Sequence, residues 1–415
     1  MHARKRCHQE PPGAEVAQVH ALTAAKRRIS KIFDHFPKIY LSGPSGKDSG
    51  VMMHLVCQEA RRRGRKVGVL YVDLEAQYES TIAFVEKMFA EYADVIEPYW
   101  LCLPVALRNA VSQYQPKWTA WEPGAAWVRQ PPKIAITDPA ALPWYTTTPV
   151  MEFEEIVPAF AEWYAQGQPC ACFVGIRAQE SLNRWRAVTR KANRWHDPDS
   201  HEPVLWTTWK GETVFNAYPI YDWRTEDIWR YYGKTGATYP RTYDLMHRAG
   251  LSVHQMRICQ PYGDDQRKGL YLWHILEPET WARVVARVAG ASMGALYAQE
   301  RGNVLGRIKV TKPDGATWES YAKLLLAGMP TQSREQYENK IAVFVHWWQV
   351  KGVPMTDEAD PKLEAAKKAP SWRRVVKMIL KNDYWAKSLS FGPTKSEAFA
   401  KYQQVMKRRR ARWGL

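Results

Sequence analysis

Residues 39–49 read IYLSGPSGKDS, in which an apolar run is followed by small residues and then by the charged pair Lys47-Asp48. The run from 38 to 41 predicts a strand, and residues 50–63 predict a helix. Small residues let backbone N–H groups approach phosphate oxygens, and the N-terminus of the following helix adds a favourable dipole. The stretch therefore predicts a phosphate-binding loop, whose candidate ligands are Ser42, Gly43, Ser45, Gly46, Lys47 and Ser49.

Two kinds of phosphate loop compete for this stretch. A Walker A loop has the pattern GxxxxGK followed by Ser or Thr, whose hydroxyl holds magnesium. Here Leu41 stands in place of the first Gly, and Asp48 stands in place of the Ser or Thr. Asp48 therefore argues against a Walker-type kinase, which is the least favoured interpretation.

The predicted elements around the loop alternate between helix and strand. A strand–loop–helix–strand–helix order predicts an α/β fold with a doubly wound, mostly parallel sheet. We predict helices at residues 16–33, 50–63, 78–92, 156–166 and 225–232, and strands at residues 38–41, 67–72 and 171–175.

Composition divides the chain further. We expect residues 1–15 to be disordered, residues 16–300 to form the nucleotide-binding domain, and residues 301–415 to form a basic, α-helical C-terminal domain. Residues 95–150 are rich in Trp and Pro, and we expect an irregular insertion near the carboxyl edge of the sheet. The helices expected in the C-terminal domain cover residues 318–326, 334–351, 371–381 and 395–412.

The formal net charge is +17, and Lys and Arg gather in several clusters. Such a charge attracts phosphates, either of a nucleotide or of DNA or RNA, although a solvated basic face without a partner is the alternative. The six Cys are scattered and carry no zinc or iron–sulfur pattern. No apolar run has membrane-spanning length and no signal peptide is evident, so we expect a cytoplasmic protein without membrane contact.

Three strings resemble one protein family. Ser45-Gly46-Lys47-Asp48-Ser49 resembles the SGGxDS pyrophosphate loop, residues 175–184 (GIRAQESLNR) resemble a GxRxxES segment, and residues 219–229 (PIYDWRTEDIW) are similar to a PxxDW run. By this resemblance the chain is identified as a member of the ATP-pyrophosphatase and phosphoadenosine-phosphosulfate (PAPS) reductase superfamily, which implies an adenine nucleotide alpha hydrolase-like fold. The whole chain looks like the IbrA-like branch, which carries a C-terminal domain of unknown function. Strings typical of that branch occur at residues 73–78, 102–118, 318–323 and 382–385.

The resemblance implies roles for particular residues. It places Lys47, Asp48, Arg177 and Glu180 in catalysis, and it implies ATP or PAPS with Mg²⁺ as cofactors, the metal being held by Asp48 and Asp73. For Asp73 the alternative is a helix cap, and for the Arg177 segment it is an ordinary ion-pair network. Beyond the loop, the implied nucleotide-binding residues are Asp73, Glu75, Gly175, Arg177, Ser181 and Arg184.

The reaction is inferred partly from what the sequence lacks. Sulfonucleotide reductases use a Cys in a Glu-Cys-Gly-like tail, whereas the last cysteine here is Cys259. The resemblance therefore implies attack on the α-phosphate of ATP, which releases pyrophosphate and activates an unknown acceptor, with nucleic acid as one candidate. Two alternatives stay open: a nucleotide-sensing or DNA-binding regulator without turnover, and a true sulfonucleotide reductase or sulfurtransferase. The resemblance also implies a ParB/sulfiredoxin-like protein as a partner.

Overall fold

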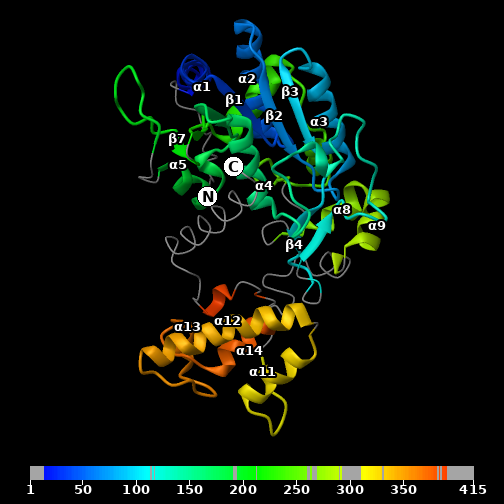
Figure 1. Ribbon diagram of the computed structural model, residues 1–415, viewed down its shortest axis with the longest axis vertical. Coiled ribbons are helices and arrows are strands. Elements are labelled where there is room, and N and C mark those ends of the chain that lie inside the picture. Colours follow the sequence, from blue (N-terminus) through cyan, green and yellow to red (C-terminus); the bar gives the residue numbers. More distant parts are fainter. Residues whose placement is uncertain are drawn as a thin grey trace, which may run out of the picture. The chain divides into compact units, whose positions relative to one another are not determined.

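The structure is a computed structural model that describes residues 14–389, except 113–114, 116, 190–193, 212, 259–261, 264–268, 289, 292–309, 330, 381–382 and 384–385 (Figure 1). The chain divides into two compact units. The first comprises Met1–Val105 and Ala120–Ile258, and the second comprises Ala106–Thr119 and Cys259–Leu415. Most of the predicted N-terminal tail, the predicted boundary at residue 300 and the predicted helix at 395–412 lie outside the described residues.

The first unit is built on a six-stranded sheet whose strand order is β3-β2-β1-β6-β8-β7. All neighbouring strands are parallel except β7, which runs antiparallel to β8. Strands β2 and β6 are fully buried, and the middle three residues of β1 are buried, which is typical of parallel strands covered on both faces. The prediction of a doubly wound, mostly parallel sheet is therefore confirmed. The strands are β1 (Lys38–Ser42), β2 (Val67–Val72), β3 (Ile96–Leu101), β6 (Cys170–Phe173), β7 (Thr207–Trp209) and β8 (Val214–Ala217).

Strand β1 lies at the point where the strand order reverses. Its Leu41 is paired with Val69 of β2 on one side and with Phe173 of β6 on the other. The chain runs outward from β1 through β2 to β3, and it returns to β6 on the opposite side of β1. In open α/β sheets, ligands bind in the crevice beyond the carboxyl ends of the strands at such a point. The loops that follow β1 and β6 therefore border the expected ligand position.

Helices cover both faces of the sheet. On one face, the hydroxyl of Tyr164 in α4 (Phe153–Ala165) donates a hydrogen bond to the carbonyl oxygen of Ile39 at 3.0 Å, and its ring packs 5.6 Å from the ring of Tyr40. On the other face, Phe33 of α1 (Ala14–His35) stacks 6.3 Å from Phe173. The crossover helices are α2 (Lys47–Arg63) and α3 (Glu79–Glu91).

The segment predicted as an irregular insertion begins with a regular strand. Residues 96–101 form β3, an edge strand in which Pro98 is aligned with Val69 of β2. Pro cannot donate to a strand ladder, so it is confined to edge positions, and its presence concealed this strand in the sequence. After β3 the segment contains a small two-stranded sheet, β4 (Val105–Arg108) with β5 (Lys117–Ala120), and a 3₁₀ turn, η1 (Pro139–Ala141).

Several shorter helices follow. The helix predicted at 225–232 is α6 (Thr225–Thr235), and its N-cap is Arg224. The carboxylate of Asp227 accepts the backbone N–H of Arg224 at 2.8 Å and so satisfies one of the free donors at this end of the helix. The remaining elements are η2 (Ala178–Glu180), α5 (Leu182–Thr189), α7 (Thr242–Arg248), α8 (Tyr271–Leu276) and α9 (Pro278–Arg287).

The C-terminal region is helical, as predicted. Its buried cluster includes Tyr337, Phe344, Val375 and Ile379, which come from two of its helices. The side chain of Thr317 accepts a hydrogen bond from the backbone N–H of Ser320 and caps the first helix. The elements are α11 (Trp318–Ala327), α12 (Thr331–Val350), α13 (Pro361–Ala365), α14 (Trp372–Leu380) and η4 (Lys387–Leu389).

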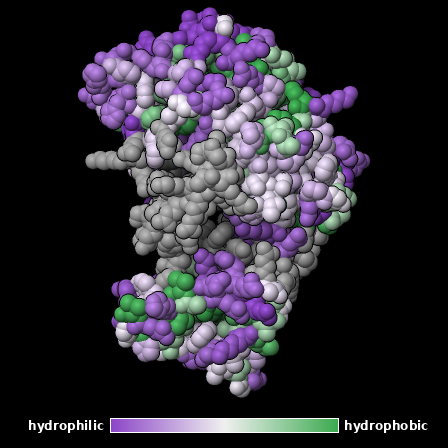
Figure 2. Space-filling model, viewed as in Figure 1, coloured by the Kyte–Doolittle hydropathy of each residue, from purple (hydrophilic) through white to green (hydrophobic). Residues whose placement is uncertain are grey.

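Among the described residues, no helix is both long enough and apolar enough to cross a membrane. The face of the molecule drawn in Figure 2 is mostly hydrophilic, with apolar residues scattered among polar ones. This surface agrees with the high content of Lys and Arg in the sequence.

Candidate nucleotide site

The predicted phosphate loop joins β1 to α2 at the switch point. Gly43 has a φ of +70°, in the left-handed region that residues with a Cβ rarely adopt. Its N–H donates to the carbonyl oxygen of Leu70 at 2.9 Å, which fixes the start of the loop against β2. Helix α2 begins at Lys47, earlier than the predicted residue 50, so Lys47, Asp48 and Ser49 form its first turn. Here the helix dipole favours a negative charge.

Gly175, after β6, packs directly against this first turn. A Cβ added to Gly175 would lie 2.8 Å from Cα and 2.9 Å from the backbone nitrogen of Ser49. Because these neighbours are backbone atoms, they cannot move aside as a side chain would. Glycine at this position therefore lets the segment after β6 approach the loop after β1, and this close approach brings Arg177 to the loop.

The four residues predicted for catalysis lie together. Nε of Arg177 is 2.6 Å from Oδ1 of Asp48, and Nζ of Lys47 is 3.0 Å from Oδ2 of the same carboxylate. Oε1 of Glu180 accepts the backbone N–H of Arg177 at 3.2 Å, and its Oε2 is 2.9 Å from NH1 of Arg184. Lys47 and Arg177 are 6% and 2% exposed. The result is a compact chain of alternating charges at the N-terminus of α2.

Two tyrosines that the sequence did not single out hold Lys47 in place. The hydroxyl of Tyr232, in α6, donates to the carbonyl oxygen of Lys47 at 2.7 Å, and the backbone N–H of Lys47 donates to the hydroxyl of Tyr243, in α7, at 3.2 Å. Nζ of Lys47 also lies 5.4 Å from the centre of the Tyr243 ring. Burial raises the pKa of Tyr232, so this hydroxyl stays protonated and available as a donor.

Gln179 supports the Arg177 side of the site and was also missed. Its Oε1 accepts the backbone N–H of Thr225 at 2.9 Å and lies 3.2 Å from NH1 of Arg177. Ser181 follows, and its Oγ accepts the backbone N–H of Arg184 at 3.2 Å. A Gln or a helical Tyr carries no sequence signal for such a role, because either residue is common on any protein surface or core.

Asp73 lies at the end of β2 and is fully buried. Its carboxylate forms an ion pair with Arg129 and accepts the indole N–H of Trp100 at 2.8 Å. The indole N–H of Trp121 donates to the backbone carbonyl oxygen of Asp73 at 2.8 Å. These contacts tie residues of the Trp- and Pro-rich segment to the end of β2.

Glu75 has a related arrangement. It is fully buried, and its carboxylate accepts the backbone N–H groups of Trp121 at 2.6 Å and of Val128 at 3.0 Å. A carboxylate that accepts two backbone hydrogen bonds fixes the loop that donates them. The structure thus gives Asp73 and Glu75 an anchoring function, and their contact with a nucleotide stays a prediction.

Magnesium was predicted at Asp48 and Asp73. Both oxygens of Asp73 are engaged by Arg129, and the side chain is not exposed, so Asp73 does not fit a magnesium ligand in this conformation. Asp48 is 14% exposed and lies between two cations. It can offer an oxygen to a metal only when Lys47 or Arg177 turns to another anion, such as a phosphate. A metal role for Asp48 therefore stays a prediction that requires a bound nucleotide.

The described cysteines do not form a second reactive site. Cys57, Cys102, Cys170 and Cys172 are buried free thiols. Burial raises the pKa of Cys170, which disfavours the reactive thiolate. Cys7 and Cys259 lie outside the described residues.

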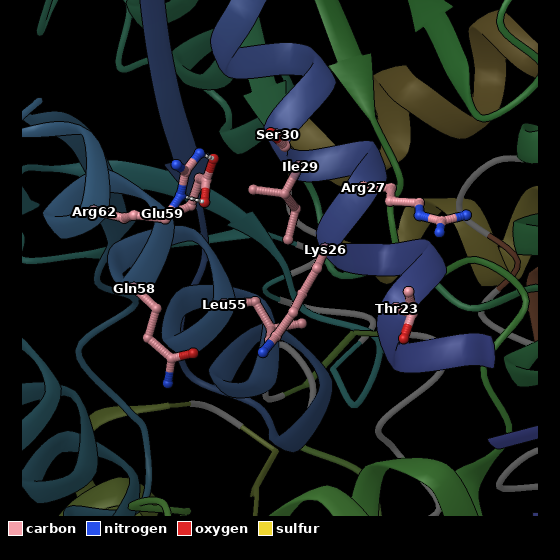
Figure 3. Close-up of a pocket in the computed structure, with 9 residues that line it drawn as sticks. All are labelled: Thr23, Lys26, Arg27, Ile29, Ser30, Leu55, Gln58, Glu59 and Arg62. Carbon is pink, nitrogen blue, oxygen red and sulfur yellow. Dashed lines mark hydrogen bonds and ion pairs between the residues drawn. The ribbon is translucent and has the colours of Figure 1, made fainter. Parts of the chain in front are cut away.

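Two polar features lie away from the phosphate loop. Carboxylates of Asp197 and Asp199 approach His35, but Lys31 already forms an ion pair with Asp197. A cleft of about 440 Å³ separates α1 from α2, and in Figure 3 Lys26 extends from α1 toward α2. The carboxylate of Glu59, which lines this cleft, accepts a hydrogen bond from Arg62, and this bond lowers the pKa of Glu59 to about 2. Neither feature combines a phosphate cradle with reactive groups, so the loop at α2 is the candidate site.

Comparisons with known proteins identify the family of the chain. Residues 143–249 match the phosphoadenosine phosphosulfate reductase domain, and residues 250–368 match a domain of unknown function, DUF3440. "Uncharacterized protein YbdN" of Escherichia coli (strain K12) is 44% identical over 398 residues, which cover 95% of this chain and 96% of that protein. The chain therefore belongs to the PAPS reductase-like superfamily of adenine-nucleotide-binding proteins, with a C-terminal domain of unknown function. The narrower assignment to the IbrA-like branch stays a prediction.

More distant relatives align with parts of the chain. Sulfate adenylyltransferase subunit 2 of Mycobacterium sp. (strain JLS) is 23% identical over 345 residues, which cover 79% of this chain and 97% of that protein. A crystal structure of the PAPS reductase of Candida auris in complex with phosphate covers 57% of this chain and 93% of its own, with 12% identity and a TM-score of 0.30.

Proposed function

We propose that the chain binds ATP at the start of α2 and cleaves it between the α- and β-phosphates to adenylylate an acceptor. The observation that carries this proposal is the position of Lys47 and Arg177, two buried cations that meet at one carboxylate at the N-terminus of a helix. Buried cations at a helix N-terminus provide a fixed electrostatic environment for a polyphosphate.

In the proposed reaction, the site stabilises the pyrophosphate that leaves. An acceptor oxygen attacks the α-phosphorus, the bridging bond to the β-phosphate breaks, and its electron pair leaves with pyrophosphate. Lys47 and the N-terminus of α2 bind the β- and γ-phosphates, where negative charge develops. Arg177 binds the α-phosphate with its planar guanidinium, and Glu180 orients both Arg177 and Arg184.

Magnesium would enter with the nucleotide. Mg²⁺ is usually bound through substrate phosphates, one or two carboxylates and waters, and it neutralises charge on the leaving group. Asp48 is the carboxylate in position to contact it once the phosphates have taken over Lys47 and Arg177.

One group of named relatives supports adenylyl transfer as the reaction. A protein called sulfate adenylyltransferase subunit 2 aligns with most of this chain. The described cysteines are all buried, which does not favour a sulfonucleotide reductase or a sulfurtransferase. PAPS as the nucleotide, the ParB/sulfiredoxin-like partner and the cytoplasmic location stay predictions.

The direct experiment incubates the purified full-length chain with Mg²⁺ and ATP labelled in the α-phosphate. We expect labelled AMP or a labelled adenylylated acceptor, together with pyrophosphate. Labelled ADP with free phosphate would reject the proposed bond cleavage. Replacing ATP by PAPS in a binding assay tests the choice of nucleotide.

One observation favours a second function, a nucleotide-sensing or DNA-binding regulator without turnover. Asp48 forms ion pairs with both Lys47 and Arg177, so a phosphate can bind by exchanging these ion pairs without any chemistry. A regulator would bind ATP with loss of the Asp48 contacts and would release neither AMP nor ADP. Product analysis therefore separates the two functions.

A further inference from the structure

Helix α5 exposes an aromatic ring, and the two residues next to it in the sequence are exposed arginines. Trp185 is 49% exposed, and Arg184 and Arg186 on either side of it are also exposed. We call these three residues the α5 surface. An exposed indole whose neighbours in the chain are exposed arginines offers a flat ring for stacking and cations for phosphates on the same helix.

We propose that the α5 surface binds a single-stranded nucleic acid, which is the acceptor of the adenylyl group. This inference rests on the proposed function for the transfer step and adds the class of acceptor to it. An oxygen of the strand would form the new bond to the α-phosphorus and pyrophosphate would leave with the electron pair, while the proton of an attacking hydroxyl would pass to water.

The α5 surface is fixed to the candidate site by direct contacts. NH1 of Arg184 lies 2.9 Å from Oε2 of Glu180, and Oε1 of Glu180 accepts the backbone N–H of Arg177 at 3.2 Å. NH2 of Arg257 donates to the backbone carbonyl oxygen of Glu180 at 2.8 Å and adds a further exposed cation. A strand that binds α5 is thereby held beside the guanidinium that we assign to the α-phosphate.

The chemistry of the surface favours a single strand over other acceptors. Unpaired bases stack on aromatic rings, and arginines at the rim bind the phosphates between the bases. Sulfate needs no aromatic platform. A duplex keeps its bases stacked inside, and an acidic protein gains nothing specific from an exposed indole. The net charge of +17 adds a general attraction for a polyanion.

Strand binding is measured by fluorescence polarisation of labelled thymidine and uridine oligonucleotides with the full-length chain. We expect Trp185→Ala to weaken binding about tenfold, because one base–aromatic stack is worth about 1–3 kcal/mol. Trp185→Phe retains a ring and should retain most of the affinity. The matched control is Trp347→Ala, which removes another exposed Trp, 39% exposed and located on α12. Comparing DNA and RNA strands of the same length shows which of the two nucleic acids the surface binds more tightly.

The salt dependence gives an independent readout. Arg186→Gln should reduce the slope of log affinity against log salt by about 0.7, because one phosphate contact to a single strand is lost. Arg62→Gln is the control, since it removes the same charge from an exposed position near the other end of α2.

Four results would overturn the inference: equal losses in the Trp185→Ala and Trp347→Ala variants, equal affinity for duplex and single strand, stimulation of AMP release by sulfate and not by the strand, or selective binding of a protein to the α5 surface. Strand binding that depends on Trp185, without any AMP release, would support the surface and reject the proposed ATP chemistry. AMP release combined with strand binding that does not depend on Trp185 would support the proposed ATP chemistry and reject the α5 surface.

Discussion

Nε of Arg177 lies 2.6 Å from Oδ1 of Asp48, although 129 positions separate the two residues in the chain. The contact joins the segment after β6 to the first turn of α2, where the strand order of the sheet reverses. Both side chains are largely buried, with exposed fractions of 3% and 14%. The ion pair therefore belongs to the architecture of the candidate site rather than to the surface.

A double-mutant cycle measures this contact. We expect Asp48→Asn and Arg177→Met to be non-additive in the free energy of unfolding, with a coupling of about 0.5–3 kcal/mol, because the residues are in direct contact. Urea unfolding of the wild type, both single variants and the double variant gives the value. Strict additivity would mean that the ion pair does not hold the two segments together.

Lys47→Ala tests the leaving-group assignment. Loss of one preorganised donor to a developing negative charge costs about 10²–10³ in kcat. We expect a loss of this size in AMP release from ATP and a melting temperature close to that of the wild type. Lys26→Ala, on α1, removes the same charge from an exposed position and is the control. Equal activity in the two variants would contradict the assignment of Lys47.

Gly175→Ala tests the close approach behind the phosphate loop. The new methyl group would lie under 3 Å from backbone atoms of Ser49, so either α2 or the segment after β6 must move. We expect weaker binding of ATP and a lower melting temperature. Gly233→Ala is the matched control, because its Cβ position in α6 has no atom within 4 Å other than its chain neighbours and the backbone of the helix, and Ala is the better helix former. That variant should be as stable as the wild type or more stable, with unchanged ATP affinity.

The sequence predicted the three central strands of the sheet better than the outer strands. Strands β2 and β6 and the middle of β1 (residues 39–41) are buried, mostly apolar runs, which predict parallel strands directly. Strand β3 contains Glu97 and Pro98, and β8 has only four residues, VFNA, so neither has a clear apolar or alternating pattern. Their positions depend on pairing with strands distant in sequence, which local patterns do not contain.

The sequence also predicted some residues of the candidate site and missed others. Lys47, Asp48, Arg177 and Glu180 were predicted from short strings, and the fold brings all four together. The supporting contacts from Tyr232, Tyr243 and Gln179 depend on how α6 and α7 pack against the loop. A sequence pattern can identify charged groups with few alternative uses, but it cannot identify a tyrosine whose role is fixed only by tertiary packing.

Asp73→Asn tests the anchoring function of the buried carboxylate. Breaking a buried ion pair by removing one charge costs about 3–5 kcal/mol, because the other charge stays buried without compensation. We expect a loss of that size in the free energy of unfolding. The double variant Asp73→Asn, Arg129→Met should recover part of it, because it removes the uncompensated guanidinium. A double variant that is less stable than Asp73→Asn would show that Arg129 contributes mainly through other contacts, such as its position 5.1 Å over the Trp121 ring.

His54, in α2, makes stability depend on pH. It is 1% exposed, its Nδ1 lies 2.6 Å from the hydroxyl of Tyr92, and its Nε2 lies 2.7 Å from the carbonyl oxygen of Thr238. Burial lowers the pKa of His54 below its ordinary value of 6.5. The folded protein therefore holds this imidazole neutral at pH values where the unfolded chain takes up a proton, so the stabilisation is complete above pH 6.5 and is lost as the pH falls below it.

The measurement is urea unfolding of the wild type and of His54→Gln between about pH 8 and about pH 5. Other groups also titrate in this range, so the informative quantity is the difference between the two slopes, which approaches about 1.4 kcal/mol per pH unit for one proton. We expect the wild type to lose stability more steeply than His54→Gln as the pH falls. His254→Gln, whose side chain is 58% exposed, should follow the wild type. Parallel curves for the wild type and His54→Gln would mean that the buried imidazole accepts its proton in the folded state without cost.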